Sequence, residues 1–268
     1  MKKLLIFTVA VALTTLAAPV GAADIPLLAS GATGTITGSV GGIALFTQGA
    51  NLSGSGVFPA FVQVGSNNTI NAAYNTTVNG VGSNGNSDTF NHEITLSQVT
   101  QVTVDNVLYY EFLLDINENK NDIDRYLSLD DLRVYTSDTA NQSSVPFPAD
   151  PGAANTLVWA MPTTGEGEHI LLDYSLEPGS GRADMSFRVR AEAFGTATGS
   201  SYVYLYSQFG VLGTTSHGGK TGADWGASAG FEEWAYNIQT ISVPDGGITA
   251  FMLGLGMLGL GVVRRFRR

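Results

Sequence analysis

The segment Val107-Leu-Tyr-Tyr-Glu-Phe-Leu-Leu-Asp-Ile116 carries the clearest strand signal in the chain. Alternate side chains of a strand share one face. This predicts two sets, with Tyr110, Phe112, Leu114 and Ile116 on one face and Tyr109, Glu111, Leu113 and Asp115 on the other. Upstream, residues 94–104 alternate in part, and Asp105-Asn106 is a turn dipeptide between the two segments. The sequence therefore predicts a β-hairpin over residues 94–116.

Short strand-like segments recur along the rest of the chain, between turns rich in Gly and Asn. They are predicted at residues 33–37, 43–48, 57–64, 126–135, 156–161, 169–176, 184–194, 202–209 and 231–243. Helical periodicity is scarce between residues 24 and 242, and residues 24–90 are rich in Gly, Ser and Asn, which indicates long loops. The pattern predicts an all-β fold, an antiparallel β-sandwich that is jelly-roll-like. A closed barrel is the weaker alternative because strand lengths are uneven.

The first 23 residues have the pattern of a secretory signal peptide. Met1-Lys2-Lys3 is basic, residues 4–18 are apolar apart from three threonines, and Pro19 precedes small residues. Cleavage is expected after Ala22 or Ala23. The alternative is an uncleaved N-terminal anchor. The folded domain is therefore predicted to span residues 24–242 and to be exported.

The other end of the chain has three features in order: Val243-Pro244-Asp245-Gly246-Gly247, an uncharged segment over residues 248–263, and a basic end. As a helix the uncharged segment spans about 24 Å, somewhat less than a bilayer core of about 30 Å. The basic residues are Arg264, Arg265, Arg267 and Arg268. Basic flanks stay cytoplasmic, so the preceding domain is expected to face away from the cytoplasm. A plain C-terminal tail anchor is the alternative.

This order of features resembles the PEP-CTERM family of bacterial sorting signals, and most closely its Val-Pro-Asp-Ser-Gly variant. Asp245 and Gly246 depart from the usual residues at those positions, and the resemblance covers residues 243–268. It implies recognition by an exosortase, a membrane-embedded enzyme similar to cysteine proteases. It also implies that the protein is held in the inner membrane before processing, and that removal of the tail delivers it to the cell surface or the extracellular matrix.

Parts of the body also resemble a group of exported PEP-CTERM proteins that has no assigned activity. The resemblance rests on the segments at residues 112–117, 127–132, 178–181, 202–207 and 230–234. It implies one exported β domain and transfers no catalytic residues.

The exported part of the chain is strongly acidic. All 23 acidic residues but only seven of the 13 basic residues lie between Asp24 and Asp245, which gives that part a formal charge of −16. Such a surface repels nucleic-acid phosphates and anionic membrane, so no nucleic-acid partner is expected. The chain has no cysteine, which excludes disulfides and thiolate chemistry.

Oxygen-bearing side chains recur in Asp115-Ile-Asn-Glu-Asn-Lys-Asn-Asp-Ile-Asp124. Ca²⁺ takes about six to eight oxygen ligands. The segment begins like a helix–loop–helix calcium loop, but Lys120 stands in place of the turn glycine and Tyr126 in place of the bidentate glutamate. The pattern predicts a β-loop calcium site whose ligands are Asp115, Asn117, Asn119, Asp122 and Asp124. A solvated hairpin loop is the alternative, because Asn and Asp also favour turns.

Other motifs do not complete a catalytic site. In segment 126–135, Leu127, Leu129 and Asp131 are expected on one face and Ser128, Asp130 and Leu132 on the other, which would separate Asp130 from Asp131. Glu111 and Asp115 lie about 13 Å apart along a strand, too far for a glycosidase pair at roughly 5–9.5 Å. The segment 226–230 matches G-x-S-x-G, but every histidine lies upstream of it. His92, His169 and His217 lack zinc-site spacing.

The resulting hypothesis is a non-enzymatic exported protein of the cell surface or extracellular matrix, stabilised by Ca²⁺ and processed at its tail. The alternative is a carbohydrate-binding module or a glycan-active hydrolase that acts on extracellular polysaccharide. A groove lined by exposed aromatic residues such as Tyr202, Tyr204 or Trp225 would favour that alternative.

Overall fold

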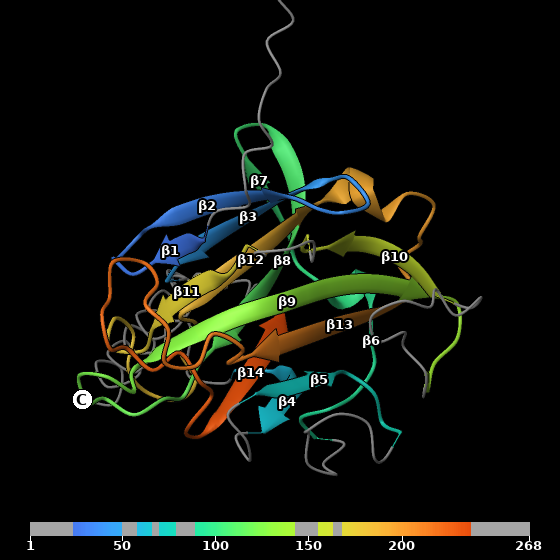
Figure 1. Ribbon diagram of the computed structural model, residues 1–268. Coiled ribbons are helices and arrows are strands. Elements are labelled where there is room, and N and C mark those ends of the chain that lie inside the picture. The colour runs from blue at the N-terminus through green and yellow to red at the C-terminus, as the bar shows by residue number, and fades with distance from the viewer. Residues whose placement is uncertain are drawn as a thin grey trace, which may run out of the picture.

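The computed structural model describes residues 24–49, 58–65, 70–78, 89–142, 155–162 and 168–236. Within these ranges the chain forms two sheets of seven strands each and no α-helix (Figure 1). Two short 3₁₀ helices, η1 (Leu96–Gln98) and η2 (Ala191–Phe194), follow strands. The predicted all-β, sandwich-like fold is confirmed.

The first sheet is antiparallel except at one edge, where β1 pairs with β11 in parallel. Its strand order is β1 (Ile25–Leu27), β11 (Ile170–Asp173), β9 (Tyr126–Ser137), β13 (Tyr202–Phe209) and β5 (Asn71–Tyr74). In addition, β10 (Asn155–Ala160) pairs with β9, and β6 (Ile94–Thr95) pairs with β13.

The second sheet is antiparallel throughout. Its order is β2 (Thr33–Thr37), β3 (Ile43–Gln48), β12 (Met185–Arg190), β8 (Val107–Asp115), β14 (Phe231–Tyr236) and β4 (Ala60–Gly65), and β7 (Gln101–Val104) pairs with β8. The Gly-, Ser- and Asn-rich residues 24–90 therefore supply β1 to β5. Strands β1 and β5 belong to the first sheet, and β2, β3 and β4 belong to the second.

The main core contains apolar side chains from both sheets. Phe112, Leu114 and Ile116, which were predicted to share one face, are buried in it together. Phe187 of the neighbouring strand β12 stacks on Phe112, with ring centroids 5.8 Å apart, and its ring also meets Trp234 at 6.1 Å. Aromatic pairs of this kind add to the stabilisation from buried area.

The β7–β8 turn is built as the sequence predicts. Asp105 and Asn106 have φ angles of 49° and 63°, and two consecutive left-handed residues define the two-residue turn that suits the twist of a hairpin. The strand predicted over residues 94–104 is, however, interrupted. Residues 94–95 pair with β13 in the first sheet, η1 follows, and β7 then pairs with β8 in the second sheet.

The predicted faces of β9 are wrong beyond residue 129. Leu129 and Leu132 both lie in the core, so Asp130 and Asp131 are both left off the inward face. The register with β13 shifts here, since Gln208 pairs with Asp131 and Phe209 pairs with Leu129. An extra residue of this kind is a β-bulge, which redirects side chains and interrupts strict alternation. The expectation that Asp130 and Asp131 point to opposite faces is therefore corrected.

The predicted signal peptide at residues 1–23, the sorting motif at residues 243–247, the helix at residues 248–263 and the terminal arginines lie outside the described residues. Within the ranges that are described, no helix has the length and apolar character needed to cross a membrane.

Candidate functional site

The five predicted calcium ligands differ widely in burial. Asp115 is buried at the end of β8, whereas Asn119 and Asp122 are exposed and Asn117 and Asp124 are half-buried. The Asn117 amide donates to the carbonyl oxygen of Phe231 at 2.9 Å. Asp124 accepts a hydrogen bond of 2.6 Å from Asn121, which also closes the local turn. Of the predicted set, Asp115 alone enters the group of buried carboxylates described next.

Four buried carboxylates gather where β8, β12 and β14 meet. They are Asp115 at the end of β8, Glu118 in the loop that follows, Asp184 just before β12, and Glu232 in β14, each at most 5 % exposed. Strand pairing brings them close. Asp115 lies opposite Glu233 of β14, and Asp184 donates its backbone N–H to the carbonyl of Leu114 at 2.8 Å.

Backbone donors meet part of the hydrogen-bonding capacity of this carboxylate cluster (Asp115, Glu118, Asp184 and Glu232). The N–H of Gly181 donates to Oδ2 of Asp115 at 2.5 Å, and the N–H of Ile116 donates to Oδ2 of Asp184 at 2.8 Å. Glu118 accepts from the backbone N–H of Ser228 at 3.1 Å and from its hydroxyl at 3.0 Å.

Four carboxylate oxygens in the cluster have no hydrogen-bond partner. They are Oδ1 of Asp115, Oδ1 of Asp184 and both oxygens of Glu232. None of the four carboxylates forms an ion pair with a described Lys, Arg or His. A buried carboxylate without a partner is costly to ionise, so the cluster must be neutralised by protons or by a cation taken from solvent.

The proton affinities of the cluster agree with this. Burial raises the pKa of Asp115 to about 7, and the nearby charge of Glu233 adds to that rise. Burial raises the pKa of Glu118 to about 8, although hydrogen bonds from Ser228 oppose the rise. The pKa values of Asp184 and Glu232 are also well above their ordinary range, first because of burial and then because of neighbouring carboxylates. The backbone N–H of Asn117 partly offsets the rise in the pKa of Glu232 without making a hydrogen bond of normal geometry.

Sequence reasoning found one member of this cluster and missed three. Glu118 lies inside the predicted loop, but it falls between the predicted ligands Asn117 and Asn119 and was not itself predicted as a ligand. Asp184 and Glu232 adjoin strands distant in sequence, and their proximity to Asp115 depends on the pairing of β12 and β14 with β8. No described group of three or more His, Asp or Glu side chains is arranged to hold a metal ion.

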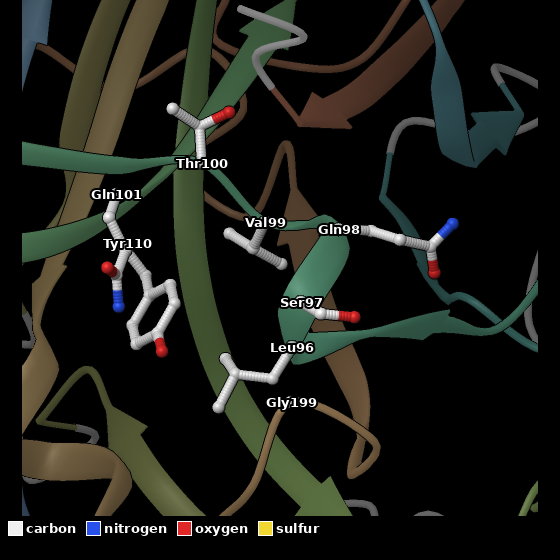
Figure 2. A pocket seen from close by; sticks show the side chains of 8 residues that line it. All are labelled: Leu96, Ser97, Gln98, Val99, Thr100, Gln101, Tyr110 and Gly199. Atoms are coloured by element: carbon white, nitrogen blue, oxygen red, sulfur yellow. The ribbon is translucent and has the colours of Figure 1, made fainter.

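A separate surface hollow of about 460 Å³ lies beside η1. It is lined by residues 96–101 together with Tyr110 and Gly199. Figure 2 shows the side chains of Leu96, Val99 and Tyr110 on one side of η1 and that of Gln98 extending away from them. The ring of Tyr110 packs against Phe194 with centroids 4.6 Å apart. The lining contains no carboxylate or histidine that would supply acid–base chemistry.

The aromatic residues proposed for a sugar-binding groove are largely unavailable. Tyr204 and Trp225 are fully buried, and the indole N–H of Trp225 donates to the carbonyl of Thr215 at 2.9 Å. Tyr202 alone of the three retains partial exposure. In the segment matching G-x-S-x-G, the Ser228 hydroxyl donates to Glu118, so it serves the carboxylate cluster.

The arrangement of the histidines differs most from the sequence analysis, in which their spacing gave no indication that any two of them meet. His169 and His217, remote in sequence, lie with ring centroids 5.9 Å apart, and each binds a carboxylate through Nδ1. The carboxylate that pairs with His169 is that of Asp130, which lies at the β-bulge of β9.

No family model and no curated protein matches this sequence, and no solved structure matches the chain.

Proposed function

We propose that the protein is a non-enzymatic, exported β-sandwich of the cell surface or extracellular matrix whose native state is stabilised by Ca²⁺ at the carboxylate cluster. The observation that carries the proposal is the set of four unpartnered oxygens on Asp115, Asp184 and Glu232, all on buried side chains. Ca²⁺ prefers carboxylate and backbone carbonyl oxygens, and the cluster offers several carboxylate oxygens with no described basic side chain paired to them.

The loop predicted to bind calcium begins within this cluster. Asp115 belongs to both, and the segment that contains Asn117, Asn119, Asp122 and Asp124 runs directly from it. Since no described group of three or more carboxylates is arranged to hold an ion, binding would require the cluster carboxylates and the loop oxygens to move closer together. The ion would then replace protons as the neutralising charge, and its binding to the native state alone would raise the free energy of unfolding.

Export and processing complete the proposal. The chain is directed to the inner membrane by its predicted signal peptide, is held there by the apolar segment at residues 248–263, and is released by an exosortase-type enzyme that recognises residues 243–247. Mass spectrometry of the surface-exposed protein tests this step. Loss of the terminal arginines supports it, and a surface form that retains Arg268 contradicts tail removal.

Within the β-sandwich class, we assign the fold to the jelly-roll-like type. The chain changes sheet seven times among the described strands: after β1, β4, β6, β8, β11, β12 and β13. Repeated crossing between two facing sheets is typical of that type.

The calcium proposal is tested by thermal unfolding of the full-length chain, purified in mild detergent, with Ca²⁺ and with excess chelator. A rise in the unfolding midpoint with Ca²⁺ that Asp115→Asn abolishes is expected. The control is Asp138→Asn, which removes a carboxylate from an exposed position outside the loop and the cluster. An unchanged midpoint across millimolar Ca²⁺ would overturn calcium binding and leave protons as the neutralising charge.

A further inference from the structure

Two histidine–carboxylate pairs that share no residue with the carboxylate cluster lie side by side at the edge of the first sheet. Nδ1 of His169 is 2.8 Å from Oδ1 of Asp130, and Nδ1 of His217 is 2.6 Å from Oδ2 of Asp24. The two imidazole rings meet edge to face, with centroids 5.9 Å apart and an interplanar angle of 69°.

The carboxylate of Asp130 is held in place by hydrogen bonds from two other residues. The Asp130 side chain is 3 % exposed, and its Oδ2 accepts from the Ser128 hydroxyl at 3.0 Å and from the backbone N–H of Val211 at 2.7 Å. These two donors leave Oδ1 directed to His169. The β-bulge in β9 and the loop containing Val211 thus fix the ring orientation of His169.

The hydrogen bonds define the tautomer of each neutral ring. An ionised carboxylate only accepts hydrogen bonds, so Nδ1 of each histidine carries the proton and Nε2 carries the lone pair. No described residue makes a hydrogen bond to either Nε2. The side chains of His169 and His217 remain 16 % and 28 % exposed, so solvent reaches both side chains.

This is the arrangement that metal-binding histidines adopt, in which Nε2 binds the metal while Nδ1–H donates to a carboxylate. Each Zn–N bond is about 2.0–2.1 Å long in tetrahedral geometry, so two imidazoles that share one zinc ion have ring centroids roughly 5 Å apart. The observed separation of 5.9 Å is slightly larger, so the rings would approach each other by less than about 1 Å when the ion binds. Imidazole nitrogen also favours divalent transition metals over the hard cations that carboxylates select.

We propose that His169 and His217 form a two-histidine site for a divalent transition-metal ion of the zinc class, with Asp130 and Asp24 orienting the rings and water completing the coordination. The site joins the start of β1, the segment before β11 and the loop after β13. A bound ion would therefore tie together parts of the chain that are remote in sequence.

The test is calorimetric titration of the full-length protein, made without a polyhistidine tag, with Zn²⁺ as the probe. The key variants are His169→Asn and His217→Asn. The asparagine amide can keep the hydrogen bond to the carboxylate in place of Nδ1–H, but it lacks Nε2. The matched control is His92→Asn, which changes the remaining histidine and leaves the pair intact.

Saturable binding of one Zn²⁺ per chain at submillimolar concentration is expected for the wild type and for the His92 variant. Each of the two key variants should lose it, and Asp24→Asn should weaken it by roughly 10–100-fold. Unfolding midpoints in chelator establish that each variant is folded. Absence of saturable binding in the wild type, or wild-type affinity in both folded key variants, would overturn the proposal.

Discussion

Replacing Asp115 by asparagine should stabilise the protein at alkaline pH in the absence of divalent cations. The pKa of Asp115 is raised to about 7 from an ordinary value of 3.8, so above neutral pH the native state holds a buried negative charge that the unfolded state accommodates freely. One pKa unit corresponds to about 1.4 kcal/mol. The shift therefore sets an upper limit of about 4 kcal/mol on the cost of that charge.

The sign follows from proton linkage. Between the unfolded and folded pKa values of Asp115 the native state binds more protons, so the free energy of unfolding falls as pH rises from about 4 to about 7. Below pH 4 the carboxyl is neutral in both states and no penalty exists. Glu118, Asp184 and Glu232 have raised pKa values for the same reason and steepen the decline in the wild type.

The assay is urea unfolding of the full-length protein in chelator at pH 5 and pH 8. Asparagine does not titrate in this range, and its amide oxygen can still accept from Gly181. We expect the difference between Asp115→Asn and wild type to grow in favour of the variant by about 1–3 kcal/mol from pH 5 to pH 8. In thermal unfolding at pH 8, each kcal/mol of this difference corresponds to a shift of roughly 2–4 °C in the unfolding midpoint.

Comparing the two pH values separates the charge from any local repacking, because repacking acts equally at both. Asp122→Asn removes the same formal charge from an exposed position of the same loop and should show no such pH-dependent gain. If the advantage of Asp115→Asn does not grow between pH 5 and pH 8, the reasoning from a buried, unpartnered carboxylate is refuted. Added Ca²⁺ should reverse the order at pH 8, because the wild type alone keeps the Asp115 carboxylate.

Two further predictions concern the scaffold. Arg133→Met should lower the free energy of unfolding by about 3–5 kcal/mol, because it leaves the buried carboxylate of Asp131 without its ionic partner. Arg133 donates two hydrogen bonds to that carboxylate. A loss below about 1 kcal/mol in urea unfolding would show that the pair contributes no more than an exposed ion pair. Gly230→Ala should destabilise more than Gly222→Ala in the same assay. Both glycines have φ near +70°, a conformation that costs an alanine about 1–2 kcal/mol, but only at Gly230 would the new Cβ also overlap the carbonyl of Asn117, whereas nothing lies within 4 Å at Gly222.

Local pattern sufficed for much of the fold. Strands β2, β3 and β13 occupy the predicted ranges, and the Asp105-Asn106 turn follows from two residue types that tolerate positive φ. The bulge at Asp130 was not predicted because a bulge is defined by the partner strand, and residues 126–135 alternate well enough on their own. Strand periodicity assumes that each residue pairs with one residue of the partner strand, whereas at a bulge two residues of one strand lie opposite one residue of the other.

The candidate sites were less predictable for the same physical reason. Asp115, Asp184 and Glu232 have unremarkable neighbours in sequence, and they become a cluster only when β12 and β14 pair with β8. His169 and His217 likewise meet across the start of β1. The local spacing rules apply to ligands carried by one turn or one helix, and they give no signal when strands far apart in sequence supply the groups.

The distribution of positive charge gives the strongest reason to look for a neutralising ion from solvent. Residues 24–245 include seven basic residues and 23 acidic ones, and each of the described arginines already forms an ion pair with another carboxylate. The pairs are Arg125–Asp173, Arg133–Asp131, Arg182–Glu177, Arg188–Glu111 and Arg190–Glu192. Lys120 is exposed, and Lys220 lies over the ring of Tyr126. Because no described basic side chain pairs with the carboxylate cluster, its charge must be balanced by protons or by a cation, and the Asp115→Asn experiment distinguishes these two cases.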